Sequence, residues 1–451
     1  MRSMGIRGVR SALVSLLLLM VVAAGCASTA EKTAAPTAPP TSPASIPASA
    51  PATLTAEGNA TSEPPEDVAV SEPPQNLESY DELRGELQAV FSEWSATSSA
   101  PGASLAVQLS DGAVLEFVAG KSNLQSGSAV EERSVFRIAS ISKSLTAATV
   151  LALVEEGLVE LDAPVADYLG PDWVGQHTYA SEITVRQILG HTSGLVEYAF
   201  NPGFGAEAQS RYGTPWAPED ILDFVGRQGP EFAPGASFSY NTGGSIAAGL
   251  LIEEVTAQTA AEAMRARLFD PAGATAIGLA PQDPISQHHV SGYVDGGLAR
   301  LMISSDPQVD QGITLAGGTP VVDVLTVDQA TLRSAGWTGG GVEADMASTA
   351  AVWHAMFDGT VLGPDAVSEL VTPLLTSSYG LGLRLASVDG SAVYSHTGGT
   401  AGFSSEAGYI EAIDASFAMS ANTSASNHGV NALASRVIQT LLTAHKQGEE
   451  K

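Results

Sequence analysis

The sequence has little cysteine, lysine or positive charge. A single cysteine in 451 residues means that no disulfide can form within the chain. The 20 basic and 49 acidic residues give a net charge of −29, which argues against a surface for nucleic acid or anionic membrane, because either requires a basic patch. The eight histidines are scattered, without the spacing of metal ligands. We therefore expect no metal and no nucleic-acid partner, and we attribute the acidity to solubility.

The first 77 residues differ in composition from the rest. Residues 1–25 combine three arginines with a short apolar run, as an export signal does. Cys26 follows the small residues Ala23-Ala24-Gly25. This resembles a bacterial lipoprotein processing site and implies a lipid on the Cys26 sulfur. Residues 26–77 are rich in Ala, Pro, Ser and Thr and predict a disordered tether. We expect an exported protein anchored outside the cytoplasmic membrane; ordinary secretion is the alternative.

The rest of the sequence predicts one folded domain, residues 78–446, followed by a short tail, residues 447–451. The 44% hydrophobic content is ample for a large core. Strand patterns near both ends flank a helical middle, which predicts an α+β fold: an antiparallel sheet flanked by helices, with a helical lobe. We expect strands at 103–109, 114–119, 379–386, 391–395, 406–412 and 416–422, and helices at 83–94, from Ser140 to Gly157, at 247–257 and at 430–445.

Ser140 and Lys143 form a Ser-x-x-Lys pattern at the start of an apolar helical run. Residues three apart on a helix are neighbours on one face, so a lysine amine there could take the serine proton. Lys143 is the only lysine between residues 122 and 445, so its place in an apolar helix needs a reason. A snorkelling surface lysine is the alternative, although it would oppose the positive end of the helix dipole.

Two later segments carry further candidate residues. Tyr240 precedes the predicted helix at 247–257, and its phenol could relay protons, although a turn tyrosine is the simpler reading. Near the C-terminus, His396-Thr397-Gly398-Gly399 ends a predicted strand at a glycine-rich turn. Backbone N–H groups there could stabilise an oxyanion. A hairpin turn without further role is the alternative.

The order of these three segments resembles the penicillin-recognising serine hydrolases, and within them the class C β-lactamase, D-alanyl-D-alanine carboxypeptidase and esterase branch. The likeness covers residues 79–443. It includes Pro234-Gly235 and the segments 136–146, 183–195, 268–273, 339–342 and 379–382. The resemblance implies a β-lactamase/transpeptidase-like fold and no cofactor.

Each motif position of the family implies a role. Ser140 would be the nucleophile, Lys143 its base, and Tyr240 a second base that protonates the leaving group. The N–H groups of Ser140 and Gly399 would form the oxyanion hole. His396, Thr397 and Gly398, together with Thr242, would bind the substrate, with His396 and Thr397 at its carboxylate or polar end.

The sequence departs from the family at Thr242. The family has Tyr-x-Asn, whereas this chain has Tyr240-Asn241-Thr242. Asn241 could replace the missing amide only if the turn shifted by one residue, and a threonine hydroxyl lacks the two-ended reach of an amide. His396 stands where many members have lysine, so its charge would depend on pH. Both changes weaken the case for an efficient β-lactamase.

We therefore expect a serine hydrolase most like a D-alanyl-D-alanine carboxypeptidase. A carboxyl esterase and a true β-lactamase are the enzyme alternatives, with a D-alanyl peptide, ester or β-lactam as substrate. A penicillin- or ligand-binding lipoprotein without turnover is the alternative from another class. We expect a monomer, anchored to the membrane only through Cys26.

Overall fold

The computed structural model describes most of the predicted domain. The predicted signal segment, Cys26 and the tether lie outside the described residues, which are 80–211, 213–285, 288–295, 313–314, 320–326, 329–424 and 429–449. Within these residues no helix is long and apolar enough to cross a membrane.

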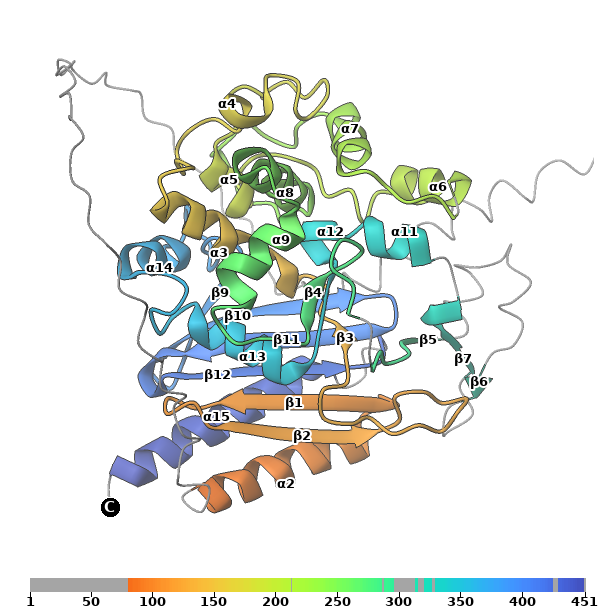
Figure 1. The fold of residues 1–451 in the computed structure, drawn as a ribbon, viewed down its shortest axis with the longest axis vertical. Helices are drawn as coiled ribbons and strands as arrows, with labels where there is room; N and C mark the ends of the chain where they lie inside the picture. Colours follow the sequence, from red (N-terminus) through yellow and green to blue (C-terminus); the bar gives the residue numbers. More distant parts are fainter. Residues whose placement is uncertain are drawn as a thin grey trace, which may run out of the picture.

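A six-stranded antiparallel sheet lies at the centre of the domain (Figure 1). Its strands follow the order β2-β1-β12-β11-β10-β9, so that segments from both ends of the chain pair through β1 and β12. This confirms the predicted sheet built from both ends. The strands are β1 (Gly102–Gln108), β2 (Val114–Gly120), β9 (Arg384–Val388), β10 (Ser391–Thr400), β11 (Phe403–Ile410) and β12 (Ala415–Ala421).

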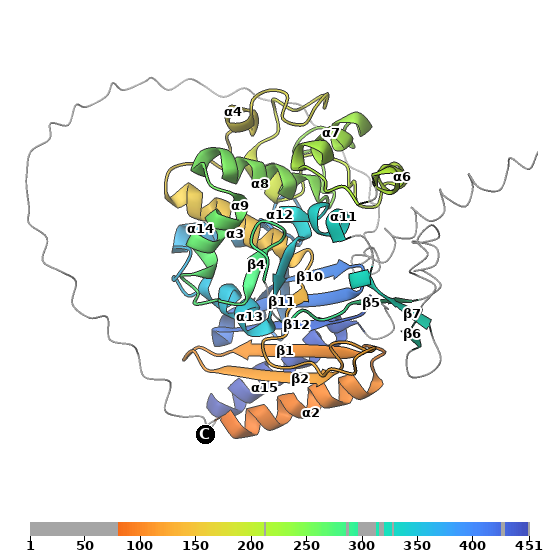
Figure 2. The same cartoon turned by 45° about the vertical axis from the view of Figure 1, so that its right-hand side comes forward.

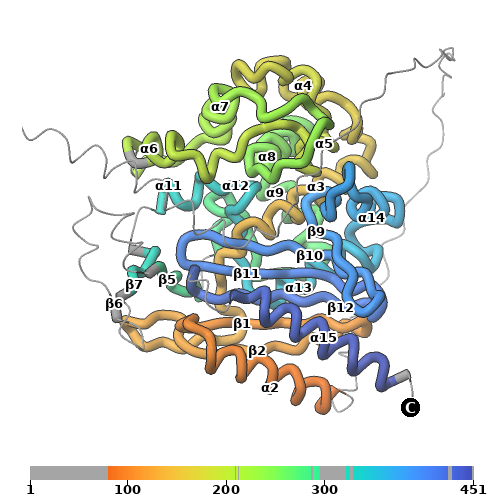
Figure 3. The backbone as a smooth tube through the Cα atoms, turned by 180° about the vertical axis from the view of Figure 1, so that it is seen from behind, coloured from red at the N-terminus to blue at the C-terminus, as the bar shows by residue number. Residues whose placement is uncertain are grey.

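One face of the sheet is covered by the first and last described helices, α2 (Asp81–Thr97) and α15 (Val430–Glu449), which lie side by side (Figure 3). Alternate residues of the strands, such as Leu105 and Phe417, point into this layer and are fully buried. Helix α15 extends three residues beyond the predicted domain end at residue 446, while its buried apolar face ends at Leu442.

The opposite face carries the helical part of the chain (Figures 1 and 2). Helices α3 (Ile141–Glu155) and α13 (Met346–Ala355) pack near the sheet, and α8 (Gly243–Thr256) packs on α3 farther from it. The other helices are α4 (Ala166–Leu169), α5 (Val185–Leu189), α6 (Pro202–Ser210), α7 (Pro218–Gln228), α9 (Ala260–Met264), the π-helix η2 (Arg265–Phe269), the 3-10 helices η4 (Val324–Thr326) and η5 (Glu411–Ile413), α11 (Gln329–Ser334), α12 (Trp337–Gly340) and α14 (Pro364–Val371).

Two small three-stranded sheets complete the described structure, in the orders β3-β8-β4 and β5-β7-β6. The first ties the segment before α3 to the segment after α12, because β3 pairs with β8. The strands are β3 (Phe136–Arg137), β4 (Ile277–Leu279), β5 (Tyr293–Asp295), β6 (Ile313–Thr314), β7 (Pro320–Asp323) and β8 (Val342–Ala344).

Three predicted boundaries were wrong. The strand expected at 391–395 continues to Thr400, so that His396, Thr397, Gly398 and Gly399 lie within β10 and pair with β11. The strand expected at 379–386 begins only at Arg384, because Gly382 adopts a positive φ of +74° and turns the chain against α3. A Cβ atom on Gly382 would lie 2.7 Å from the Lys143 carbonyl oxygen. The helix expected from residue 247 begins at Gly243, where the Asn241 side-chain oxygen accepts the Gly244 N–H and caps the first turn.

Candidate active site

A sharp turn presents Ser140 at the start of α3. The preceding residue, Ala139, has a φ of +49°, which is unfavourable for a residue with a Cβ atom. The Ser142 hydroxyl holds this turn, because it donates to the Ala139 carbonyl at 2.6 Å and accepts the Val342 N–H at 3.0 Å. The side chain of Ser140 is partly exposed, whereas the next residues of α3 are buried.

Lys143 lies one helical turn farther along α3 and is 2% exposed. Its Nζ donates to the Ser140 Oγ at 3.3 Å and to the Gly339 carbonyl at 2.7 Å. The same nitrogen lies 5.0 Å from the centre of the Tyr240 ring. The structure therefore brings together the three residues to which the sequence assigned catalysis.

The two residues after Tyr240 are held by other parts of the protein. Asn241 is fully buried; its oxygen caps α8, and its nitrogen donates to the Ser239 carbonyl at 3.1 Å. Thr242 donates its hydroxyl to the Glu197 Oε2 at 2.9 Å. The turn is therefore not shifted by one residue, and the Asn241 amide does not take the place of the family asparagine.

His396 lies in a chain of directed hydrogen bonds. Its Nδ1 is 2.7 Å from the Thr397 carbonyl, which can only accept, so Nδ1 carries the proton. Burial lowers the pKa of His396 to about 3, and the nearby cations of Lys143 and Arg384 act in the same direction. The neutral ring therefore accepts at Nε2, and the Tyr379 hydroxyl donates to it at 2.9 Å.

The chain continues through His191. The Tyr379 oxygen is 3.1 Å from the His191 Nε2, which must donate because the tyrosine proton is already committed to His396. At the other end, the Asn241 N–H points to the His191 Nδ1 at 3.4 Å. Burial, with Lys143 and His396 nearby, lowers the pKa of His191 well below its usual range. The chain thus links the Tyr240 loop to β10 through neutral rings.

This arrangement bears on the expected contact between His396 and a substrate carboxylate. Both ring nitrogens are bonded within the protein, the side chain is 1% exposed, and the ring is uncharged at neutral pH. Its charge would therefore change with pH only in the acid range, near the lowered pKa of about 3. The structure does not bring His396 to the substrate as a cation.

The three residues after His396 on β10 point to different faces of the sheet. Alternation along the strand puts Gly398 on the face that α3 covers, and Thr397 and Gly399 on the α15 face. Gly398 packs directly on the chain before Ser140, since a Cβ atom there would lie 2.0 Å from the Ile138 carbonyl oxygen. This contact brings the end of β10 to the Ser140 turn, while an oxyanion hole formed by Ser140 and Gly399 stays a prediction.

The comparison with known families agrees with this geometry. A family model described as Beta-lactamase matches residues 87–442, which is most of the chain. This chain belongs to the Beta-lactamase family. The α+β fold, with its antiparallel sheet and flanking helices, is the fold of its structural neighbours and confirms the expected fold class.

Several relatives of this Beta-lactamase family protein are hydrolases or penicillin-binding proteins. It is 33% identical to penicillin-binding protein 4 of Amycolatopsis lactamdurans over 38% of this chain and 43% of that protein. It is 31% identical to esterase EstB of Burkholderia gladioli over 37% of this chain and 43% of that protein. The matches thus span less than half of each relative. The resemblance is confirmed at the level of the family, which this chain shares with a penicillin-binding protein and an esterase.

The fold is also that of a solved D-amino acid amidase from Ochrobactrum anthropi. The two structures superpose with a TM-score of 0.67 at 23% identity, over 81% of this chain and all of the amidase chain. At this identity the likeness concerns the fold alone.

Sequence reasoning missed four residues of the site. His191 and Tyr379 stood in segments of the family resemblance, but nothing in their spacing showed that they would meet. Gly339 acts through its carbonyl oxygen, which no sequence pattern reports. Glu197 did leave a signal, because it is the one acidic residue in the otherwise apolar and aromatic segment 195–200.

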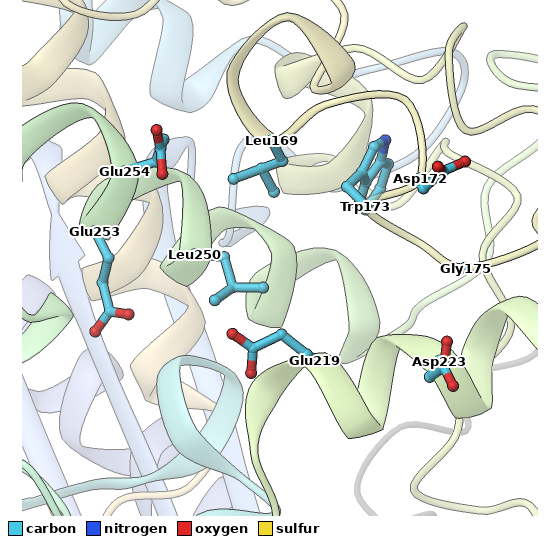
Figure 4. Close-up of a pocket in the computed structure, with 9 residues that line it drawn as sticks. All are labelled: Leu169, Asp172, Trp173, Gly175, Glu219, Asp223, Leu250, Glu253 and Glu254. Carbon is cyan, nitrogen blue, oxygen red and sulfur yellow. The ribbon is translucent and has the colours of Figure 1, made fainter.

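A pocket with a volume of about 460 Å³ lies in the helical lobe, and Ser140 does not line it. Figure 4 shows the nine residues that line it, among them five carboxylates on α7, α8 and the segment that includes Asp172. These carboxylates point in different directions, and no three acidic, histidine or cysteine side chains converge on a metal position within the described residues. We therefore assign the active site to Ser140 and its neighbours.

Proposed function

We propose that the protein is an exported hydrolase that forms an acyl-enzyme on Ser140. The observation that carries this proposal is the buried Lys143 amine, 3.3 Å from the Ser140 hydroxyl and directed by the Gly339 carbonyl. Serine becomes a good nucleophile when a neighbouring base takes its proton. A buried lysine suits that work, because burial favours the neutral amine.

In the proposed reaction, the Ser140 Oγ attacks the substrate carbonyl and gives its proton to Lys143. A carbon–oxygen bond forms to Ser140, and the bond to the leaving group breaks as the proton held by Lys143 passes through the Tyr240 hydroxyl to the leaving group, which leaves both Lys143 and Tyr240 in their starting states. The N–H groups of Ser140 and Gly399 stabilise the oxyanion. Water then attacks the acyl-enzyme, releases the acid and restores the Ser140 hydroxyl.

The proposed substrate is a D-alanyl peptide or a related amide, as the family resemblance implies. The neutral, buried His396 favours a second candidate, a small carboxylic ester, because an ester needs no cation to hold a terminal carboxylate. The relationship to an esterase supports this candidate. A β-lactam as the true substrate is less well supported because of Thr242 and the neutral His396. A binding protein without turnover is less well supported because Ser140, Lys143 and Tyr240 are assembled.

The location and assembly of the protein are also proposals. Export and a lipid anchor at Cys26 rest on the sequence of residues 1–26 alone. Thr242 and Gly398 are proposed to line the substrate, and Thr397, whose side chain lies on the α15 face, is proposed to contribute only through its backbone. A monomer is proposed as the working state, without cofactor or nucleic acid.

The experiment that tests this proposal follows covalent labelling and turnover together. The protein and its Ser140→Ala variant are incubated with a fluorescent penicillin and, separately, with a chromogenic ester, and the label is measured by intact mass. We expect ester hydrolysis that Ser140→Ala abolishes, and a label carried only by Ser140. A lasting label without turnover would favour the binding protein, and neither label nor hydrolysis would refute the proposal.

A further inference from the structure

The Glu197 carboxylate is held at the start of α8 by three hydrogen bonds. Its Oε1 accepts the Ala199 N–H at 2.7 Å and its Oε2 accepts the Thr242 hydroxyl at 2.9 Å. The Thr242 N–H also bonds to this carboxylate. Thr242 is the N-cap residue of α8, so the anion also lies at the positive end of that helix. Glu197 therefore fixes the loop that carries Tyr240.

Thr242 connects this carboxylate to the backbone that holds Lys143. Its hydroxyl points to Glu197, while its methyl group faces Gly339, where an added Cβ atom would lie 2.5 Å from the Thr242 Cγ2. The Gly339 carbonyl is the atom that accepts from the Lys143 Nζ. A threonine turned in this way offers no amide oxygen to Lys143, in contrast to the asparagine of the family motif.

The charges around Lys143 point to the same residue. Tyr240 lies over Lys143, with its ring centre 5.0 Å from the Nζ, and the Lys143 charge also acts on the pKa values of His191, His396 and Glu197. Both histidine rings are uncharged at neutral pH. Tyr198 and Tyr379 adjoin this group, and burial raises the pKa of Tyr198 well above its usual range, so that it stays neutral. Among these side chains, Glu197 is therefore the one that can carry a negative charge near Lys143.

The pKa of Glu197 reflects two opposing effects. Burial raises it above the ordinary value, while the Lys143 charge and the bonds from Ala199 and Thr242 lower it in part. Electrostatic coupling is mutual, so the carboxylate must stabilise the ammonium form of Lys143 as much as Lys143 stabilises the carboxylate.

We propose that Glu197, acting through Thr242, is the positioning residue that replaces the amide of the family Tyr-x-Asn motif. It fixes the Tyr240 loop against Gly339, and it stabilises the ammonium that Lys143 forms on receiving the Ser140 proton. This inference rests on the proposed function of Ser140 and Lys143.

The test is the pH dependence of kcat/KM for a chromogenic ester, measured on the whole protein and its Glu197→Gln variant. Glutamine keeps the shape and removes the charge. We expect the acid limb of the profile to move to lower pH by about one unit, since the ammonium loses its anion. The activity plateau should fall about three- to tenfold. Glu254→Gln, at the exposed far end of α8, is the matched control and should change neither.

Further variants separate positioning from a merely structural role. In the Glu197→Gln background, Thr242→Asn should restore part of the plateau while the acid limb stays displaced. If Glu197→Gln does not fold, Thr242→Val alone should lower the plateau about tenfold with the limb unmoved, because the carboxylate remains. An unchanged plateau in Thr242→Val would refute the connection through Thr242.

Three outcomes would overturn the inference or its premise. An unmoved acid limb in a folded Glu197→Gln variant, or no acid limb in the unaltered protein, would overturn the proposed role of Glu197 and leave Ser140 catalysis standing. Absence of any hydrolysis by the unaltered protein would instead refute the proposed function itself.

Discussion

The two faces of the six-stranded sheet are buried to a similar degree by different kinds of side chain. On the α15 face, Leu105 and Phe417 are fully buried in a mainly apolar layer. On the α3 face, Lys143 and His396 are 2% and 1% exposed, although both are polar. A buried apolar side chain needs only close packing, whereas a buried polar group needs a partner for each donor and acceptor.

The two faces therefore differ in role: the α15 face stabilises the fold, and the α3 face carries the candidate active site. The α15 layer stabilises the sheet through buried apolar area, so many combinations of large side chains could serve there. The α3 layer fixes its polar groups with backbone atoms, such as the Gly339 carbonyl for Lys143 and the Thr397 carbonyl for His396. We therefore expect substitutions on the α15 face to alter stability and those on the α3 face to alter activity.

The largest expected effect is that of Lys143→Met on activity. Loss of the proposed base should lower kcat about 10³- to 10⁴-fold. The free energy of unfolding should fall by no more than about 1 kcal/mol, because removal of a buried polar amine and of its desolvation cost offsets the lost hydrogen bonds. Ester hydrolysis and urea unfolding measure the two quantities. A strongly destabilised variant would show that Lys143 is mainly structural.

Phe417→Ala should show the opposite behaviour. Truncating this fully buried ring on the α15 face should lower the free energy of unfolding by about 3–5 kcal/mol. The kcat of the folded protein should stay within about twofold of the original, because the ring does not touch the Ser140 site. Leu158→Ala, at a residue that is 43% exposed, is the control for an apolar truncation. A large loss of kcat at full folding would break the division between the two faces.

Glu406 is a buried carboxyl group on the otherwise mainly apolar α15 face, and Glu406→Gln tests what its ionisation costs. Burial raises the Glu406 pKa to about 7 against the smaller effect of Arg384, so the folded protein binds a proton that the unfolded chain releases near pH 4.5. Stability contributed by the protonated form is present at low pH and lost as pH rises toward 7. The variant should therefore gain about 2–3 kcal/mol relative to the original between pH 5 and pH 8.

Urea unfolding at pH 5 and pH 8 measures this difference. Glu86→Gln, an exposed site on α2 on the same side of the sheet, is the matched control and should show no such change between the two pH values. An equal effect of Glu406→Gln at both pH values would show that the carboxyl ionises normally in the folded protein.

Local patterns predicted most of the fold. Alternating apolar residues revealed strands at both ends, and the 3.6-residue period placed α2, α3 and α15 within a few residues. The strand predicted over 379–383 is absent, because the close contact of Gly382 with α3 turns the chain there despite a strand-like sequence. Such a contact between distant segments cannot be read from local periodicity.

The candidate site divides in the same way. Ser140 and Lys143 were predictable, since one helix fixes their spacing, and Tyr240 was predictable from the order of the motifs. The neutral state of His396 was not predictable, because it depends on Tyr379 and on burial by other segments. The sequence showed that Thr242 stands where the family has asparagine. It did not show that Glu197 bonds to Thr242, because Glu197 lies 45 residues away in the chain.

The sequence by itself determined the fold class, the Ser-x-x-Lys pair and the departure at Thr242, because each depends on residues close together in the chain or on the order of motifs. The tertiary structure decided which atoms face Lys143, the proton positions along the chain from His191 to His396, and the partner of Thr242. Hydrogen bonding and the charge state of a buried group depend on distance and solvent access. Both are set when remote segments pack together.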